Sequence, residues 1–571
     1  MASSSHNSRR RFLQQSTTGL AGILISRQAP AIVHRKPPNI LLVMSDQEQA
    51  RVDLPKALPL PQHERLLENS LEFANYHVTT APCTPSRSVL YTGQHSKFTG
   101  AVANANTPFF NELPRSMPTL GTMLRECGYY TAYKGKWHLG SLGPAPDPQG
   151  MRYPNKSNAL QDYGFADYSE IGDAIGSTWE GFMRDREIAN DAARWLHDRG
   201  RGLKHEQPWF LAVNLVNPHD VMFYQAHANQ VDSRLHHNLL SPLRGAPLSS
   251  PYDRSWEDLP LPENVTAQNL DHQPGMHQRY VEFCDYFYGA MPRDDLALWR
   301  KFRSYYFNCI RDVDRHLGTV LDALDTTGLA DNTIVVYTSD HGELAGAHGL
   351  RQKGPFIYKE NLRVPLLIRH PDLPGGNQRT EAASAVDLVP TLLGLAGGDE
   401  VIARHTQLKG VNLAPALDTD SPSERSKTGV LVYLSLIMTD FNFFKDVASA
   451  GVQDSFSGWF NARFIKGKWT PDFSQRGVLR GMFDGRYRFG RYFGLGEHHT
   501  PQNFDTLVKH NDLELYDTAT DPTEMLNLAQ NPAKHADLIT QQNDKLNALI
   551  QSEIGNDDGA EFPGPTSLYR L

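Results

Sequence analysis

The sequence predicts an α/β fold: a doubly wound, largely parallel sheet flanked by helices, followed by a smaller C-terminal α+β domain with an antiparallel sheet. Two observations predict the main domain. The chain contains apolar runs without alternation, which are typical of strands covered on both faces. Segments of helical periodicity lie between these runs, as expected where helices join parallel strands. After about residue 396, short strand-like pieces replace this pattern.

Four apolar runs are the candidate strands of the main sheet: 39–44, 209–215, 333–337 and 364–368. Polar residues follow the first three runs at their carboxyl ends, and they include Asp46, His219 and Asp340. Open α/β sheets bind ligands at that edge. The sequence therefore predicts that the functional site lies where these strands end.

Three segments with helical periodicity are predicted to cover the sheet: 119–127, 188–196 and 299–324. No clear periodicity is found in residues 222–292, so we expect a long functional or disordered loop there. His272 and His277 fall in this stretch and are expected to be solvated. His348 is interpreted as structural.

Two strand-like pieces and a terminal helix indicate the smaller domain, at 428–434, 486–492 and 533–552. Between the strand-like pieces, residues 441–469 are rich in aromatic side chains. We interpret these rings as core or oligomer contacts, with a substrate-lining role as the alternative. The predicted organisation is a catalytic domain over 37–396 and a C-terminal subdomain over 397–571.

Composition excludes several classes of protein. The 571 residues include 56 basic and 64 acidic side chains, for a formal charge of −8, without a sustained basic stripe. We therefore exclude nucleic acid as a partner. No run approaches the ~18 apolar residues of a membrane-spanning helix. Four cysteines are too few for a disulfide scaffold.

The first 36 residues differ from the rest, because they carry six basic residues and no acidic one. Residues 8–14 resemble a twin-arginine export signal, and a short apolar run at 20–25 follows them. This pattern predicts a cleaved leader and a periplasmic or secreted protein that is exported folded. A disordered basic tail is the alternative.

The most specific motif is C-x-P-S-R-x-x-x-x-T-G, which begins at Cys83. It resembles the signature of the formylglycine-dependent sulfatases of the alkaline phosphatase superfamily. In that family a formylglycine-generating enzyme reads the Cys, Pro and Arg of the motif and oxidises the Cys. Four further family segments match in order. The first is the strand and metal-binding turn at 39–46, and the second is G-K-W-H-x-G at 135–140. The third is T-S-D-H-G-E at 338–343 with the lysine at 353 that follows it, and the fourth is E-L-Y-D-x-x-x-D-P-x-E at 514–524. A buried or disulfide-bonded cysteine in a turn is the alternative for Cys83 alone.

An aldehyde suits the hydrolysis of a sulfate monoester, whose negative charge makes sulfur resist anionic attack. The hydrated aldehyde supplies a neutral oxygen nucleophile that a base can activate. Its second hydroxyl allows sulfate to be expelled and the aldehyde restored, whereas a serine would lack that exit.

The resemblance implies a role for each matching polar residue. Arg87 orients the hydrated aldehyde, while Lys136 and Lys353 bind the sulfate oxygens. His138 is the base for the nucleophile. His219, together with Lys353, donates a proton to the leaving oxygen. The alternative for His219 is a hydrogen-bonded loop histidine.

The resemblance also implies a single divalent metal held by Asp46, Gln47, Asp340 and His341, with an oxygen of the formylglycine from Cys83 completing the set. Many family members have Asp where Gln47 stands and Asn where His341 stands. Oxygen ligands favour calcium, whereas an imidazole ligand makes manganese or zinc more acceptable. Calcium is the favoured metal.

These observations predict an enzyme that hydrolyses a small-molecule or saccharide sulfate ester into inorganic sulfate and an alcohol. The Asp-Gln and Asp-His pairs also occur in phosphonate monoester hydrolases and choline sulfatases, so hydrolysis of phosphonate monoesters or phosphodiesters is the first alternative. A non-catalytic binding protein on the same fold is the second. The alcohol is not predicted, and a homo-oligomer is compatible with the sequence.

Overall fold

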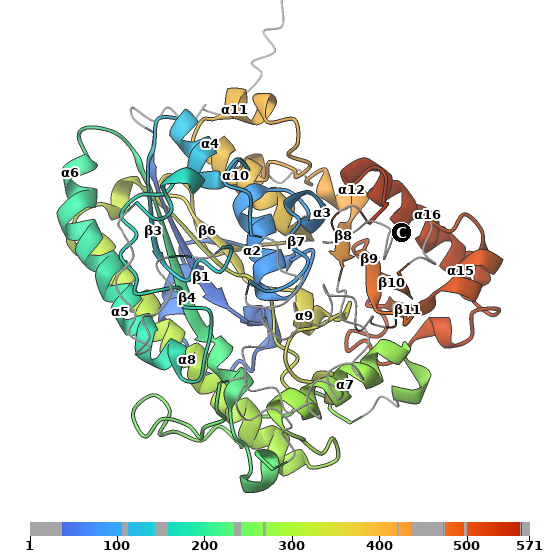
Figure 1. Ribbon diagram of the computed structural model, residues 1–571. Coiled ribbons are helices and arrows are strands. Elements are labelled where there is room, and N and C mark those ends of the chain that lie inside the picture. Colours follow the sequence, from blue (N-terminus) through green and yellow to red (C-terminus); the bar gives the residue numbers. More distant parts are fainter. Residues whose placement is uncertain are drawn as a thin grey trace, which may run out of the picture. The chain divides into compact units, whose positions relative to one another are not determined.

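The computed structural model describes residues 37–105, 112–140, 142, 158–232, 241–266, 270–419, 422–435, 472, 474–495, 500–559 and 561. The predicted export leader at 1–36 and the aromatic-rich segment 441–469 lie outside the described residues. Described residues form a seven-stranded mixed sheet, a four-stranded antiparallel sheet and the helices that cover them (Figure 1). This arrangement confirms the predicted fold class.

The centre of the large sheet is β1 (Asn39–Asp46), which pairs in parallel with β4 (Trp209–Pro218) and β5 (Thr333–Ser339). All eight residues of β1 are buried. Alternate side chains enter two separate cores: Ile40 and Leu42 pack on one face, and Leu41 and Val43 on the other. Burial on both faces explains why the sequence of this strand does not alternate.

The strand order of the large sheet is β3-β4-β1-β5-β6-β2-β7. The predicted run at 364–368 corresponds to β6 (Leu366–Arg369), which pairs antiparallel with both neighbours. Three strands were not predicted: β2 (Leu71–His77), β3 (Tyr130–Gly135) and β7 (Asn377–Ser384). They contain polar and small residues among the apolar ones, so their sequences lack a continuous apolar run.

Helices cover both faces of this sheet (Figure 1). The long helices α5 (Glu180–Trp195) and α8 (Leu296–Thr326) pack into the core that contains Leu41. The opposite core receives α2 (Cys83–Thr92), α4 (Leu120–Glu126) and α10 (Leu388–Leu395). The described residues also form shorter helices: α1 (Pro61–Leu67), α3 (Ser96–Thr99), α6 (Arg201–Leu203), α9 (Lys359–Leu362), α11 (Asp399–Arg404), α12 (Arg425–Thr428) and α15 (Phe504–His510).

The stretch 222–292 is not a loop throughout, because α7 (Gly275–Tyr288) lies within it. The expectation of a solvated His277 is wrong. Its side chain is fully buried, and its Nε2 lies 3.4 Å from a carboxylate oxygen of Glu514. His272 is exposed. The aromatic side chains that α7 buries obscured its helical periodicity.

The second sheet consists of β8 (Val430–Leu434), β9 (Val478–Phe483), β10 (Tyr487–Phe493) and β11 (Asp512–Asp517), in the order β11-β10-β9-β8. The terminal helix α16 (Ala536–Glu553) packs on it through a shared apolar core. Because these strands all follow residue 396, the sheet lies in the predicted C-terminal subdomain, whose exact boundary stays a prediction.

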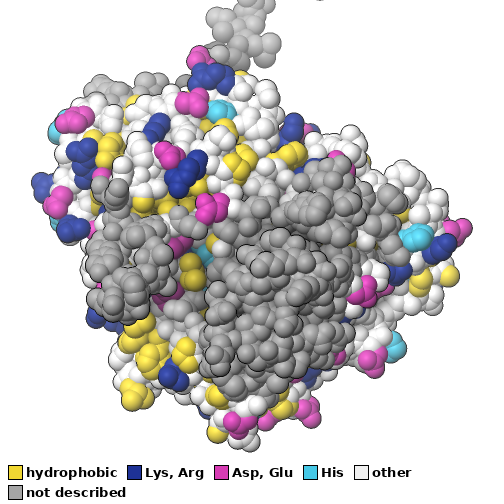
Figure 2. Space-filling model, viewed as in Figure 1, with side chains coloured by type: hydrophobic (Ala, Val, Ile, Leu, Met, Phe, Trp, Pro, Cys, Tyr) yellow, Lys and Arg dark blue, Asp and Glu magenta, His cyan; other side chains and the backbone are white. Residues whose placement is uncertain are grey.

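Charged side chains of both signs are interspersed over the described part of the face shown in Figure 2. Among the described residues, no helix is both long and apolar enough to cross a membrane. All four cysteines are free, and three of them are buried.

Candidate active site

Cys83 is the first residue of α2, and its side chain is completely buried. Its Sγ lies 3.2 Å from Nε2 of His341 and 3.7 Å from Oδ1 of Asp46. Burial and Asp46 raise the pKa of the thiol, but Lys136 and other cations outweigh them and lower it below the ordinary value. The helix ends at Thr92 and is capped by Gly93, whose left-handed conformation (φ 66°) is readily adopted by glycine.

The register of the central strands brings the two acidic residues together. Ser45 of β1 pairs with Ser339 of β5, so the residues that follow, Asp46 and Asp340, leave the same edge of the sheet side by side. The Gln47 backbone N–H donates to Oδ1 of Asp340 at 3.2 Å. This arrangement is the one expected at the carboxyl edge of a parallel sheet.

His341 completes a group of potential metal ligands. Its Nε2 lies 3.6 Å from Oδ1 of Asp340 and 3.8 Å from Oδ1 of Asp46. One ligand atom from each of Asp46, Cys83, Asp340 and His341 lies within 4.8 Å of all the others. Two buried carboxylates beside an imidazole and an amide form a donor set that a divalent cation fits.

The two carboxylates have different environments. Burial raises the pKa of Asp46, but Lys136 and His219 outweigh it and hold that pKa well below its usual range. Burial and the negative charge of Asp46 raise the pKa of Asp340. A divalent cation between them would remove this repulsion, which is why the pair favours metal binding.

Three cationic side chains surround the group. Nζ of Lys136 lies 2.5 Å from Oδ2 of Asp46, and Nζ of Lys353 donates to Oε1 of Gln47 at 2.5 Å. Nη1 of Arg87 lies 3.4 Å from Oδ2 of Asp340. These contacts place a cation beside each of three predicted metal ligands.

Arg87 is also bound to the backbone of the neighbouring segment. Its Nε donates to the carbonyl oxygen of Trp137 at 3.1 Å, and its Nη2 donates to the side chains of Tyr133 (3.1 Å) and Asn214 (2.8 Å). Through Tyr133 of β3 and Asn214 of β4, Arg87 links α2 to both strands and stabilises the arrangement of the site.

His138 lies at the site in a left-handed backbone conformation (φ 56°), and neither of its ring nitrogens has a hydrogen-bond partner among the residues that the structure describes. Asp173 fixes this conformation, because its carboxylate accepts the backbone N–H groups of Trp137 (2.9 Å) and His138 (2.7 Å). Burial and Lys136 hold the pKa of His138 well below its usual range. Burial and the neighbouring cation therefore favour the neutral form of the ring.

His219 follows β4 and is 4% exposed. Hydrogen bonds in both directions hold the turn that carries His219 against α5. The carboxylate of Asp220 accepts two backbone N–H groups at the start of α5. The carboxylate of Asp185, on α5, accepts the backbone N–H groups of Val216 and Asn217. The ring also packs on Gly176, where a Cβ would lie 2.3 Å from it. Burial and Lys353 hold the pKa of His219 well below its usual range.

The structure thus brings all ten predicted site residues to one edge of the sheet. It also shows four carboxylates to which the sequence alone assigned no role: Asp173, Asp185, Asp220 and Glu343. Each accepts backbone N–H groups from a distant or adjoining segment of the site. Only Glu343 carried a signal in the sequence, since it follows His341 by two residues.

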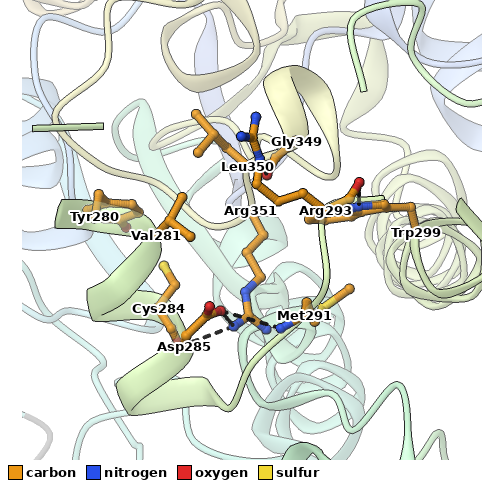
Figure 3. A pocket seen from close by; sticks show the side chains of 10 residues that line it. All are labelled: Tyr280, Val281, Cys284, Asp285, Met291, Arg293, Trp299, Gly349, Leu350 and Arg351. Carbon is orange, nitrogen blue, oxygen red and sulfur yellow. Dashed lines mark hydrogen bonds and ion pairs between the residues drawn. The ribbon is translucent and has the colours of Figure 1, made fainter. Parts of the chain in front are cut away.

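Two further features contain none of these ten residues. The first is a small cavity lined by residues of α7 and α8 and by Arg293 and Arg351. Figure 3 shows Arg351 directed toward Asp285, and its Nη2 lies 3.2 Å from Oδ1 of Asp285. His348 stacks on Tyr358, with ring centroids 3.5 Å apart. None of the ten predicted site residues lines the cavity.

The fold and the site define the class of protein: an α/β enzyme whose buried, cation-rich site suits an anionic ester. A family model described as Sulfatase matches residues 38–398. The choline-sulfatase of Rhizobium meliloti is 30% identical over 405 residues, which are 67% of this chain and 72% of that protein. The N-acetylglucosamine-6-O-sulfatase of Bacteroides thetaiotaomicron is 26% identical over 445 residues, 72% of this chain and 76% of that protein.

The chain belongs to the sulfatase family and is a sulfuric ester hydrolase. Among solved structures, the phosphonate monoester hydrolase of Agrobacterium radiobacter superposes with a TM-score of 0.60 at 21% identity, covering 90% of this chain and 96% of that one. This likeness shows the shared fold.

Proposed function

We propose that this protein hydrolyses the sulfate monoester of a small or carbohydrate alcohol, using a formylglycine made from Cys83 and one divalent metal. The observation that carries the proposal is the position of Cys83: its Sγ lies within 4 Å of Asp46 and His341, among three cationic side chains. A cysteine buried for structural reasons alone would not need this surrounding charge.

Asp46, Gln47, Asp340 and His341 would hold the metal, which supplies Lewis-acid polarisation of a sulfate oxygen. Calcium is the metal we propose, because three of the four side chains offer oxygen. Sγ of Cys83 occupies the position that an oxygen of the formylglycine would take. The modification supplies the oxygen nucleophile.

The cationic side chains stabilise the negative charge that develops on the sulfate oxygens. Fixed cations in a water-excluded site are worth more than in water, so Lys136 and Lys353 are assigned to the sulfate. Arg87 holds the N-terminal turn of α2 beside them. Because these side chains are already positioned by buried contacts, little reorganisation is needed when the anionic ester binds.

His138 and His219 are assigned to proton transfer. The ring of His138, whose nitrogens have no hydrogen-bond partner within the described part of the chain, accepts the proton of the nucleophile at position 83. We assign protonation of the leaving oxygen to His219 together with Lys353, following the resemblance described above.

Hydrolysis of phosphonate monoesters or phosphodiesters is the second candidate function. The pairs Asp46-Gln47 and Asp340-His341 favour it, since both also occur in that group of enzymes by the resemblance described above. A phosphonate monoester is likewise a singly charged tetrahedral anion, which the same cations would bind.

Peptide mass spectrometry of protein from a host with the maturation enzyme tests the nucleophile first. We expect a loss of about 18 Da at Cys83, the difference between cysteine and formylglycine. Turnover is then compared on aryl, choline and glucosamine sulfates and on an aryl phosphonate, with Cys83→Ala as the matched inactive control. Faster turnover of the phosphonate would select the second function, and an unmodified thiol in native-host protein would favour a binding role.

We further propose that the protein is exported folded to the periplasm or beyond. The arginine pair at 9–10 and the short apolar run after it support this. Replacing both arginines with lysine should retain the protein in the cytoplasm with its leader uncleaved. Export of that variant at the normal level would contradict the proposal.

A further inference from the structure

Glu343 is a fully buried carboxylate next to the candidate metal ligands, and the mechanism above gives it no part. Its Oε1 accepts the backbone N–H groups of Ala345 (2.9 Å) and Gln352 (2.7 Å). Its Oε2 accepts a short hydrogen bond from the side-chain amide of Gln47. Both carboxylate oxygens are therefore engaged by N–H donors.

The amide of Gln47 has opposite partners at its two ends. Its Nε2 donates to Glu343, and its Oε1 accepts from Nζ of Lys353. A carboxylate only accepts and an ammonium group only donates, so both neighbours require the same orientation of the amide. Reversing the amide would place its nitrogen against Lys353 and its oxygen against Glu343.

This orientation matters because Gln47 is a candidate metal ligand. An amide oxygen can bind a cation, whereas the amide nitrogen cannot serve as that ligand. A carboxylate at this position would present an oxygen in either orientation. A glutamine can present the wrong atom, so the site needs a group that selects one of the two orientations.

We propose that Glu343 is a positioning residue that holds the side-chain oxygen of Gln47 toward the metal ligands. The inference rests on the proposed function, since it assumes that Gln47 binds the metal. Contacts that orient a metal ligand from behind typically change metal affinity about 10–100-fold when they are removed.

The variant Glu343→Gln tests the proposal with almost no change in volume. The new amide has one oxygen for three N–H donors: the backbone groups of Ala345 and Gln352 and the side chain of Gln47. Whichever way it turns, its own nitrogen faces at least one of these donors. We expect the affinity for calcium and for manganese, measured by titration calorimetry, to fall about 10–100-fold.

Two further variants separate positioning from general stability. Adding Gln47→Glu to Glu343→Gln restores a donor–acceptor pair with reversed polarity, and we expect metal affinity to recover at least tenfold. The matched control is Glu514→Gln. Glu514 is equally buried and bonded to Tyr492 at 2.6 Å, and it contacts none of the ten predicted site residues, so its loss should leave metal affinity unchanged.

Metal affinity is measured without turnover, so the result does not depend on which ester is hydrolysed. Unchanged metal affinity in Glu343→Gln would overturn the proposal. So would a double variant that is as thermally stable as Glu343→Gln and yet does not recover metal affinity. The expected affinity pattern in a protein without sulfatase activity would support the positioning role while refuting the proposed function.

Discussion

His63 links the segment after β1 to two other elements, and its charge gives a pH-dependent test of the structure. It lies on α1, and its Nδ1 is 2.7 Å from Oδ1 of Asp314 on α8. Its Nε2 is 3.1 Å from Oε1 of Glu48, the residue after Gln47. Burial lowers the pKa of His63, but Glu48 and Asp314 outweigh burial and raise it to about 9 from an ordinary value of 6.5.

The direction and size of the effect follow from these two pKa values. In the folded protein His63 keeps its proton up to about pH 9, whereas in the unfolded chain it loses it near 6.5. The stabilisation is therefore complete below pH 6.5 and is lost as the pH rises through 9. Each unit between the two values is worth about 1.4 kcal/mol, so the total contribution is about 3 kcal/mol.

The assay is urea-induced unfolding of the wild type and of His63→Gln between pH 6 and 10. We expect the difference in their free energies of unfolding to shrink by about 3 kcal/mol across this range. His316→Gln is the matched control above about pH 7, because burial lowers the pKa of His316 to about 4 and the ring is then neutral in both the folded and the unfolded state. Parallel pH profiles of unfolding free energy for the wild type and His63→Gln would refute the reasoning. Asp314→Asn should move the loss of stability to lower pH, because it removes one of the two carboxylates that raise the pKa of His63.

Three other perturbations address the site. Asp340→Ala should lose the metal, because it removes one of two buried carboxylates, and undiminished metal content by elemental analysis would contradict this. Lys353→Ala should lower kcat on a sulfate ester about 10²–10³-fold; unchanged kcat/KM would remove Lys353 from the sulfate site. Asp220→Asn should cost about 1–3 kcal/mol in thermal stability, since its amide cannot accept both N–H groups at the start of α5. The same variant should lower kcat through His219, and a normal kcat would show that this turn does not position the ring.

Much of the fold could be predicted from the sequence because burial on both faces leaves a direct trace in it. The apolar runs of β1, β4 and β5 are continuous, and the periodicity of α8 is long. By contrast, β3 and β7 mix polar and small residues with apolar ones, and the many aromatic side chains of α7 hid its apolar face. For these elements the tertiary contacts, rather than local pattern, determine the structure.

The sequence by itself determined the chemistry of the site, because the Cys83 motif and the segments after β1 and β5 specify which groups are present. Only the tertiary structure decided how those groups are held. The parallel register of β1 and β5 sets Asp46 beside Asp340, and distant carboxylates such as Asp173 fix the backbone that carries His138. Such contacts join residues that are far apart in the chain. A hydrogen bond between two buried groups depends on the distance between donor and acceptor and on their relative orientation, and a sequence motif specifies neither.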